Sequence, residues 1–331
     1  MNRKIDFVIP WVDGNDPEWN KEKNYYLGKT DYEKDDNNIR YRDWDILKYW
    51  FRGVEKYAPW VNKIHFVTWK HIPPWLNVQH PKLHIVNHKD YIPEEYLPTF
   101  SSHVIELNMH RIPGLCEDFV YFNDDIFILK PLLKDDFFVD GTPCDICVSD
   151  VLIPRQDTFT SILYNNIACI NKHFSKKESI KNNFSGWFSL KYGSKLFRTL
   201  RTLHWKNFSA FYNPHLALAY KKQTLETVWT KEEELLNATC LHRFRSRFDV
   251  NQYIFRYWQL AAGEFVPHGI LGDSYSIGED KTCKIIRKQS VKLFCVNDTE
   301  QSASLDFEKE KARLINAFES VFPEKSEYEI N

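Results

Sequence analysis

Residues 97–131 read LPTFSSHVIELNMHRIPGLCEDFVYFNDDIFILKP and set a cluster of acids between two apolar runs. The first run, FVYF at 119–122, has the aromatic and β-branched residues that favour a strand, and Asn123, Asp124 and Asp125 follow it directly. Adjacent carboxylates in so apolar a segment are costly to bury unless they are paired or bound to a cation. At the carboxyl end of a strand in an open α/β sheet they would face the ligand crevice, so we predict that Asp124 and Asp125 form a divalent-cation and phosphate site. A turn between two hairpin strands is the alternative, because Asn and Asp are also turn formers.

The segment before these acids predicts a short helix. It runs over residues 103–112 and stops at a Pro-Gly pair, with Ser102 or His103 as its N-cap. Glu106 and His110 are four residues apart and would share one face of this helix.

Other apolar runs predict the rest of an α/β sheet. Strands are expected at 5–12, 63–68, 83–86 and 145–148. Helices are expected over 46–54 after Asp43 as the N-cap, over 159–174 and 187–203, from Arg245 to about residue 260, and over 307–322, and the polar residues 324–331 are expected to fray. The polar stretch 20–38 is expected to be an exposed loop. This order predicts an α/β fold with a Rossmann-like mixed sheet flanked by helices, a largely helical insertion and a helical C-terminal part.

Composition excludes several classes of protein. The 331 residues are 43% hydrophobic and 16% aromatic, which is typical of a globular chain and not of a disordered one. The 44 basic side chains nearly balance the 45 acidic ones, so general nucleic-acid binding is not expected. No apolar run has the length of a membrane span, and the N-terminus leads straight into a strand, so no signal peptide is expected. The seven cysteines, with one CxxC pair, are expected to be ordinary reduced thiols.

Four segments of the chain resemble the conserved regions of the Stealth family. The first, in 5–16, has the patterns Ile-Asp-x-Val and Trp-Val-x-Gly-x-Asp, and the second, in 97–125, has the groups LPTFSS, HRI, GL and NDD. The third, in 212–249, has the run Tyr-Asn-Pro-His and an Arg four residues before an Asp. The fourth is a strand that ends in Asn-Asp at 293–298. The Stealth family comprises the hexose-1-phosphate transferases of bacterial capsule synthesis and the animal enzyme that starts the mannose-6-phosphate tag on lysosomal hydrolases.

The resemblance implies a reaction. A sugar-1-phosphate would pass from a nucleotide-sugar donor, a UDP-hexose or UDP-N-acetylhexosamine, to a hydroxyl of a glycan or lipid-linked oligosaccharide acceptor. The product would be a phosphodiester, and UMP would leave. The alternative is a metal-dependent glycosyltransferase that uses the same acids and releases UDP.

The resemblance also assigns roles to residues. Asp124 and Asp125 would hold Mg²⁺ or Mn²⁺, with Asp125 also catalytic, and Arg245 would stabilise the transferring phosphate. His215 would either take the acceptor proton or attack phosphorus itself, and Pro214 is expected to place it in the first turn of a helix over 216–228. The residues expected to bind substrate are Asp13, Gly14, Asp16, Arg40, His110, Arg111 and Asn123.

The predicted organisation has three parts. Residues 1–131 would form the N-terminal nucleotide- and metal-binding part of the catalytic core, and residues 207–331 would complete it. Residues 132–206 would be a variable, mainly helical segment on the acceptor side. Its basic, aromatic run 191–206 would hold an anionic acceptor, lie on a membrane surface, or be a solvated helix face. The expected location is the bacterial cytoplasm, at the inner face of the membrane.

Overall fold

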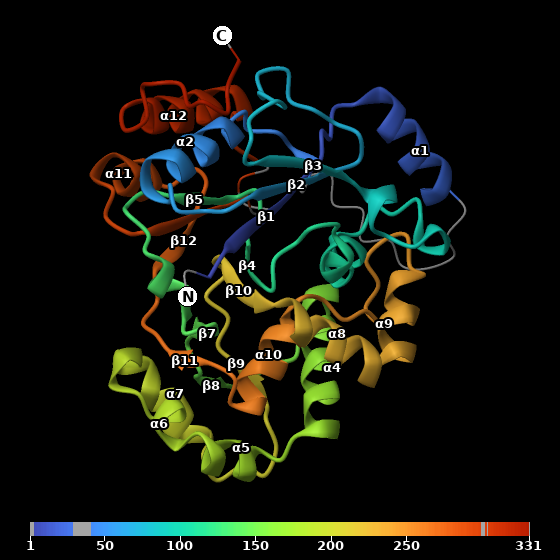
Figure 1. Ribbon diagram of the computed structural model, residues 1–331, viewed down its shortest axis with the longest axis vertical. Helices are drawn as coiled ribbons and strands as arrows, with labels where there is room; N and C mark the ends of the chain where they lie inside the picture. The colour runs from blue at the N-terminus through green and yellow to red at the C-terminus, as the bar shows by residue number, and fades with distance from the viewer. Residues whose placement is uncertain (1–2, 29–40, 299–301, 303, 331) are drawn as a thin grey trace.

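The computed structural model describes residues 3–28, 41–298, 302 and 304–330, so the predicted substrate residue Arg40 lies outside the described chain. At its centre is a five-stranded sheet with the order β10-β4-β1-β2-β3 (Figure 1). The first four strands along the chain are parallel, and β10 runs antiparallel beside β4. The bounds are β1 Ile5–Trp11, β2 Ile64–Thr68, β3 Leu83–Asn87, β4 Asp118–Tyr121 and β10 Leu218–Lys221. The predicted α/β fold with a mixed sheet is confirmed.

A second sheet has the order β12-β13-β5 and begins where β4 ends. Its strands are β5 Ile126–Ile128, β12 Gly272–Ser276 and β13 Leu293–Asn297. Because β4 and β5 belong to different sheets, the hairpin alternative for the acidic turn is wrong. Gly272 is required at its position, since a Cβ there would lie 1.6 Å from the carbonyl oxygen of Leu293.

Two small sheets complete the strands. One contains β6 Phe138–Val139, β7 Thr142–Asp145 and β11 Val266–Pro267, and the other pairs β8 Ser149–Asp150 with β9 Ala210–Phe211. The predicted strand at 145–148 is therefore displaced into β7 and β8.

One face of the central sheet is covered by α2 Leu47–Tyr57, α11 Asp280–Lys288 and α12 Phe307–Glu319. These helices pack in one hydrophobic core with β1, β5 and β13. Tyr49 stacks on Phe318 with ring centroids 5.1 Å apart, and a Cβ at Gly53 would lie 2.7 Å from the carbonyl oxygen of Ile128. Close approach of α2 to β5 thus depends on a glycine in mid-helix.

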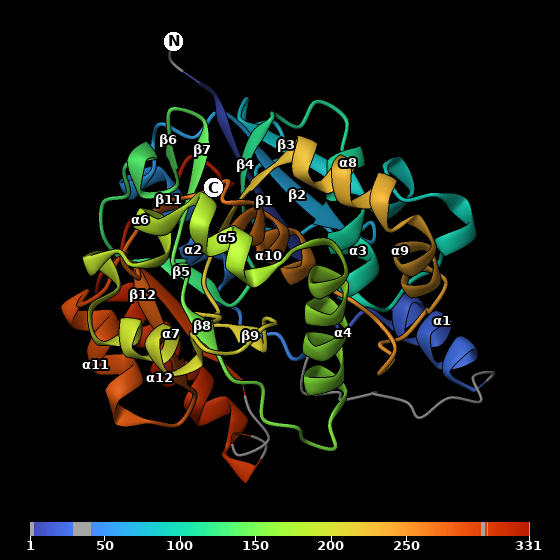
Figure 2. The same ribbon diagram turned by 90° about the horizontal axis from the view of Figure 1, so that it is seen from below.

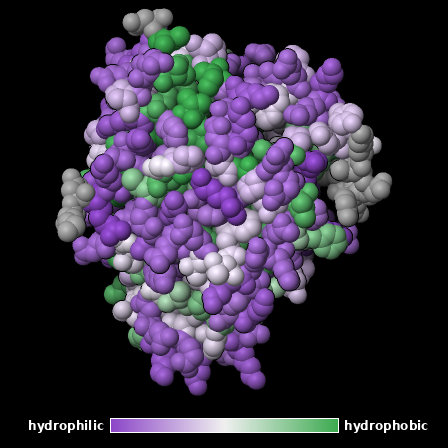
Figure 3. Space-filling view, turned by 45° about the vertical axis from the view of Figure 1, so that its right-hand side comes forward, coloured by the Kyte–Doolittle hydropathy of each residue, from purple (hydrophilic) through white to green (hydrophobic). Residues whose placement is uncertain are grey.

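The other face carries the second hydrophobic core and the remaining helices (Figure 2). The helices are α1 Pro17–Leu27, α3 Ser102–Leu107, α4 Thr158–His173, α5 Lys176–Asn182, α6 Phe184–Trp187, α7 Leu196–Thr202, α8 Lys222–Lys231, α9 Glu233–Cys240 and α10 Tyr253–Ala262. None of the helices in the described ranges combines the length and the apolar character needed to cross a bilayer. The face shown in Figure 3 is mostly hydrophilic, with one hydrophobic patch near the top of the view.

Several helix boundaries differ from the prediction. Asp16 accepts a hydrogen bond from the Trp19 amide and caps α1, so the first part of the expected 20–38 loop is helical. Asp43 accepts from the Asp45 amide instead of capping α2, which begins at Leu47. The N-cap position of α3 belongs to Ser101, so Ser102 is already helical.

Later boundaries shift as well. His215 precedes strand β10 and not a helix, and the helix expected to begin near Arg245 begins at Tyr253. The helix expected over 187–203 is broken at Gly193, which has a φ of 54°. The C-terminal residues expected to fray are held in place, because Glu329 pairs with Arg52 at 2.8 Å and Tyr328 is buried.

The buried Arg256 joins three segments near the predicted catalytic histidine. Its guanidinium donates to both carboxylate oxygens of Asp145, at 2.7 and 2.8 Å. It also donates to the Tyr212 carbonyl oxygen and to Asn213 Oδ1, just before His215. Burial opposes its charge, but Asp145 more than compensates and raises the pKa of Arg256. This network fixes the chain that leads to His215.

We expect Arg256→Met to lower the free energy of unfolding by about 3–5 kcal/mol, because the carboxylate of Asp145 is left without its partner. Denaturant unfolding monitored by circular dichroism measures the change. The double variant Arg256→Met/Asp145→Asn is the matched control and should recover part of the loss, since no uncompensated charge remains. A loss below about 1 kcal/mol in the single variant would contradict the assigned role.

Candidate active site

The acidic turn Asn123-Asp124-Asp125 is held between the two sheets. On one side the Phe122 amide donates to the Val8 carbonyl oxygen, at 2.9 Å, where the turn leaves the central sheet. On the other side the Val296 amide donates to the Asp125 carbonyl oxygen, at 2.8 Å. Backbone hydrogen bonds to both sheets therefore fix the position from which the two carboxylates project.

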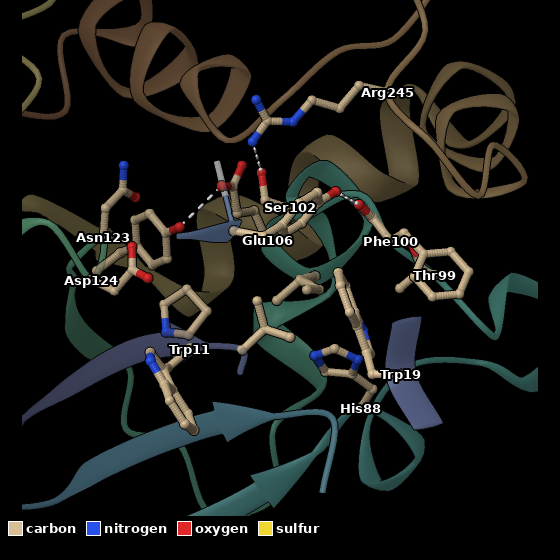
Figure 4. Close-up of a pocket in the computed structure, with 15 residues that line it drawn as sticks. Trp11, Trp19, His88, Thr99, Phe100, Ser102, Glu106, Asn123, Asp124 and Arg245 are labelled. Atoms are coloured by element: carbon tan, nitrogen blue, oxygen red, sulfur yellow. Dashed lines mark hydrogen bonds between the residues drawn. The ribbon is translucent and has the colours of Figure 1, made fainter. Parts of the chain in front are cut away.

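The first side of the turn faces a pocket (Figure 4). Asn123 and Asp124 form one wall with Trp11 below them, Arg245 reaches in from above, and Trp19 and Phe100 lie on the opposite side. The pKa of Asp124 is raised to about 7. Burial is the largest cause, and the negative charges of Asp125 and Asp43 add to it. The residues lining the pocket are Pro10, Trp11, Val12, Trp19, Tyr41, His88, Thr99, Phe100, Ser102, Ile105, Glu106, Tyr121, Asn123, Asp124 and Arg245.

Arg245 is positioned by α3. Its guanidinium donates to the Ser102 hydroxyl at 2.7 Å, and this hydroxyl lies in the first turn of the helix. A guanidinium and a hydroxyl at one wall of a pocket, with a carboxylate at the other, suit a phosphate held beside a cation. The structure thus brings the predicted residues Arg245, Asp124 and Asn123 into one pocket.

The loop that carries Arg245 is held by the buried Asp249. Its carboxylate accepts from His103 on α3 at 3.2 Å, from His242 at 2.6 Å and from the Ser246 amide at 2.8 Å. Burial alone would raise the pKa of Asp249, but the hydrogen bonds from both histidines lower it. Asp249, four residues after Arg245, therefore holds the loop in position.

Glu106 is a pocket residue whose role the sequence did not indicate. It is buried, and Tyr121 donates to its Oε1 at 3.0 Å. Burial raises the pKa of Glu106, against the opposing charges of His103 and Arg245. Other pocket residues to which the sequence assigned no binding role include Trp11 and Ser102, which lie within the motifs, and Trp19, which lies just beyond the first of them.

The second side of the turn faces His215. The Nε2 atom of His215 lies 3.4 Å from Oδ2 of Asp125, a long hydrogen-bond contact. Burial lowers the pKa of His215, but the contact with Asp125 and the charges of Asp125 and Glu106 outweigh it, so the pKa is raised above its usual value. His215 has a φ of 48°, a conformation that is rare outside glycine and is found where a side chain must point in an imposed direction.

His215 lines a second pocket together with residues from α4, α7 and the second sheet. This pocket has Asn213, Tyr253, Ser274 and Asn297 among its polar lining residues. The adjacent acids therefore serve two pockets: Asp124 lines the first, and Asp125 contacts the histidine that lines the second.

The acidic pair fits a hard divalent cation. Oδ1 of Asp125 is buried and accepts no hydrogen bond within the described ranges. Asp125, His215 and Cys295 have ligand atoms within 4.8 Å of one another, but burial raises the pKa of Cys295 and keeps its thiol protonated. The carboxylates are therefore the negatively charged groups that could bind a metal, and such oxygen ligands suit Mg²⁺ and Mn²⁺.

Other predicted substrate residues lie outside both pockets. Asp13, Gly14 and Asp16 form the turn before α1, where Asp16 caps the helix and a Cβ at Gly14 would lie 2.0 Å from the Tyr41 carbonyl oxygen. His110 and Arg111 both lie against Trp229, with ring and guanidinium centres at 5.8 and 4.9 Å from its ring. Burial lowers the pKa of His110 to about 3. The structure does not bring these five residues to the acids.

Comparison with known proteins gives matches over the whole chain. Residues 3–31 match the model for Stealth protein CR1, conserved region 1, and residues 40–144 match that for Stealth protein CR2, conserved region 2. A capsular polysaccharide phosphotransferase WcwK of Streptococcus pneumoniae is 44% identical over 330 residues, which are 98% of each chain. The exopolysaccharide phosphotransferase cps2G of Lactiplantibacillus plantarum is 38% identical over 328 residues, which are 98% of this chain and 96% of that one.

Among solved structures, galactosyltransferase LgtC in complex with donor and acceptor sugar analogs aligns over 94% of this chain and 95% of its own. The TM-score is 0.39 and the identity 8%, a likeness too distant to bear on function. The first two regions predicted from the sequence are confirmed, and the third and fourth stay predictions. With relatives this similar over nearly their full length, the chain belongs to the Stealth family of phosphotransferases.

Proposed function

We propose that the protein transfers a sugar-1-phosphate from a nucleotide sugar to a hydroxyl of an acceptor glycan, releasing UMP, in the synthesis of a capsular or other cell-surface polysaccharide. One observation carries the proposal: the adjacent acids lie between two pockets, because Asp124 lines the first with Arg245 and Asp125 contacts His215, which lines the second. A transfer between two substrates needs such a pair of pockets with the reacting phosphorus between them. The polysaccharide phosphotransferases among the relatives support the same reaction class.

The first pocket suits the donor. Its aromatic residues Trp11, Trp19 and Tyr41 offer faces on which a base can stack, and Ser102 and Arg245 offer donors to phosphate oxygens. Asp124 and Asp125 would hold the Mg²⁺ or Mn²⁺ ion, which supplies positive charge to the pyrophosphate when it is bound. Asn123 and Glu106 would complete the polar side of the pocket.

The second pocket suits the acceptor. His215 would take the proton of the attacking hydroxyl, and Asp125 would hold the imidazole in orientation and stabilise its protonated form. The acceptor oxygen then forms a bond to the phosphorus that bears the sugar, the pyrophosphate P–O bond breaks, and UMP leaves with the electron pair. Direct attack of His215 on phosphorus is the alternative route to the same products.

The rival function is an ordinary glycosyltransferase, in which the anomeric C–O bond breaks and UDP leaves. It would use the same acidic pair and the same donor pocket. We place the reaction at the inner face of the membrane of a bacterial cell, on a glycan or lipid-linked oligosaccharide.

The released nucleotide decides between the two functions. With a panel of UDP-sugars and a matching acceptor glycan, we expect UMP and a phosphodiester product, detected by chromatography and ³¹P NMR. Chelation by EDTA should abolish release, and Mg²⁺ or Mn²⁺ should restore it. Release of UDP would contradict the proposal, and undiminished turnover in EDTA would contradict the metal.

Variants of the histidine test its role. We expect His215→Ala and His215→Gln each to lower kcat by about 10²–10⁴-fold, the range typical of lost general acid–base catalysis, with little change in donor binding. Single-turnover assays with UMP binding measured by calorimetry separate the two effects. His204→Gln, an exposed histidine remote from the acids, is the matched control. Near-normal turnover in both His215 variants would rule out both roles proposed for His215, as the general base and as the nucleophile.

A further inference from the structure

Residues 177–206 carry a charge unlike that of the whole protein. They hold seven basic side chains and one acid, Glu178, although the full chain has a net charge of −1. The basic residues are Lys177, Lys181, Lys191, Lys195, Arg198, Arg201 and Lys206. The structure places all of them at the surface, with Lys195 half-buried.

The same segment exposes an unusual amount of apolar surface. Leu190 is 88% exposed, and Phe184 and Phe197 are each 64% exposed. Leu200, Leu203 and Trp205 are also exposed, so six large apolar side chains face solvent within 22 residues. On α7, Phe197, Leu200 and Arg201 share the outer face, because Thr199 and Thr202 are buried.

These residues gather at one end of the molecule. Figure 1 places α5, α6 and α7 together at the lower end of the view, with α12 and the C-terminus at the upper end. At that lower end, the space-filling view shows hydrophilic and hydrophobic residues intermixed. We call the surface formed by residues 177–206 the basic end.

The basic end borders the second pocket. Arg198 of α7 lines the pocket that contains His215, and its guanidinium pairs with Asp150 at 2.5 Å. The pocket also has exposed apolar residues at its rim, Val151 and Phe159. A surface that bound at the basic end would therefore lie beside the pocket proposed for the acceptor.

We infer that the basic end docks on the surface of an anionic membrane and presents the second pocket to acceptors carried by that membrane. Only the second part of the inference, that the second pocket is presented to acceptors, rests on the proposed function. Exposed leucine and aromatic side chains beside Lys and Arg are the combination that inserts at a lipid interface while the cations meet anionic headgroups. A second copy of the chain would bring like charges face to face, and nucleic acid offers no partner for exposed leucines.

Vesicle flotation with the full-length protein tests the docking. We expect binding to phosphatidylcholine vesicles that contain phosphatidylglycerol, weak binding to phosphatidylcholine alone, and partial loss at raised salt. Leu190→Ser/Phe197→Ser should lower the partition coefficient at least about tenfold, because both side chains are already exposed and their loss removes only the inserted surface. Arg201→Glu/Lys206→Glu should lower binding to the anionic vesicles.

The matched control is Leu133→Ser/Leu241→Ser, which removes two apolar side chains that are 62% and 53% exposed and lie outside the basic end. It should bind vesicles like the wild type, and thermal melting should show all variants folded. The inference would be overturned if the wild-type protein did not bind the vesicles, or if the control lost as much binding as Leu190→Ser/Phe197→Ser. It would also be overturned if a second copy of the chain or homopolymeric RNA bound the basic end instead.

An assay of sugar-1-phosphate transfer to an acceptor dissolved in detergent separates the test of docking from the test of the reaction. If docking is right, Leu190→Ser/Phe197→Ser keeps its activity there and loses it on vesicle-bound acceptor. If the proposed function is wrong, vesicles still bind the wild type while no nucleotide sugar yields UMP.

Discussion

The organisation of this protein depends on two adjacent carboxylates held where one sheet ends and another begins. Neighbouring acids repel each other and resist burial, which raises the pKa of Asp124, and the backbone must hold the pair in place. The backbone is fixed by β1 on one side and β13 on the other, through the hydrogen bonds at Phe122 and at Asp125. Because the turn does not close a hairpin, its two side chains serve different pockets. The placement of one pocket on each side of the acidic turn follows from that single junction.

Buried ionic groups elsewhere hold the loops that complete the two pockets. Asp249 holds the loop of Arg245 against α3 through His103 and accepts a further hydrogen bond from His242, and Arg256 holds the segment that leads to His215. In both cases a buried charge is satisfied by several hydrogen bonds, which makes the pair costly to break and its neighbours rigid. Arg245 and His215 line the pockets, while Asp249 and Arg256, which hold their loops, are buried.

The sequence predicted the parts of this structure that local pattern determines. Strands such as β1 and β2 are buried on both faces and therefore appear as continuous apolar runs, and α4 and α12 follow helical spacing. The capping signal at Asp43 failed because its carboxylate accepts from the Asp45 amide in a local turn, and α2 begins only at Leu47. The pairing of Ser102 with Arg245 joins residues 143 positions apart, and no local pattern reports it. The positive φ of His215 is likewise set by its surroundings, since histidine does not require it.

The most direct test of the two-pocket account is the position of a bound cation and nucleotide in crystals grown with Mn²⁺ and UMP. Anomalous scattering from manganese should give one peak within coordination distance of the Asp124 and Asp125 carboxylates. The UMP phosphate should lie beside that peak, with the base among the aromatic residues of the first pocket and the second pocket open to His215. A manganese peak away from both acids, or a nucleotide bound in the pocket of His215, would contradict the account.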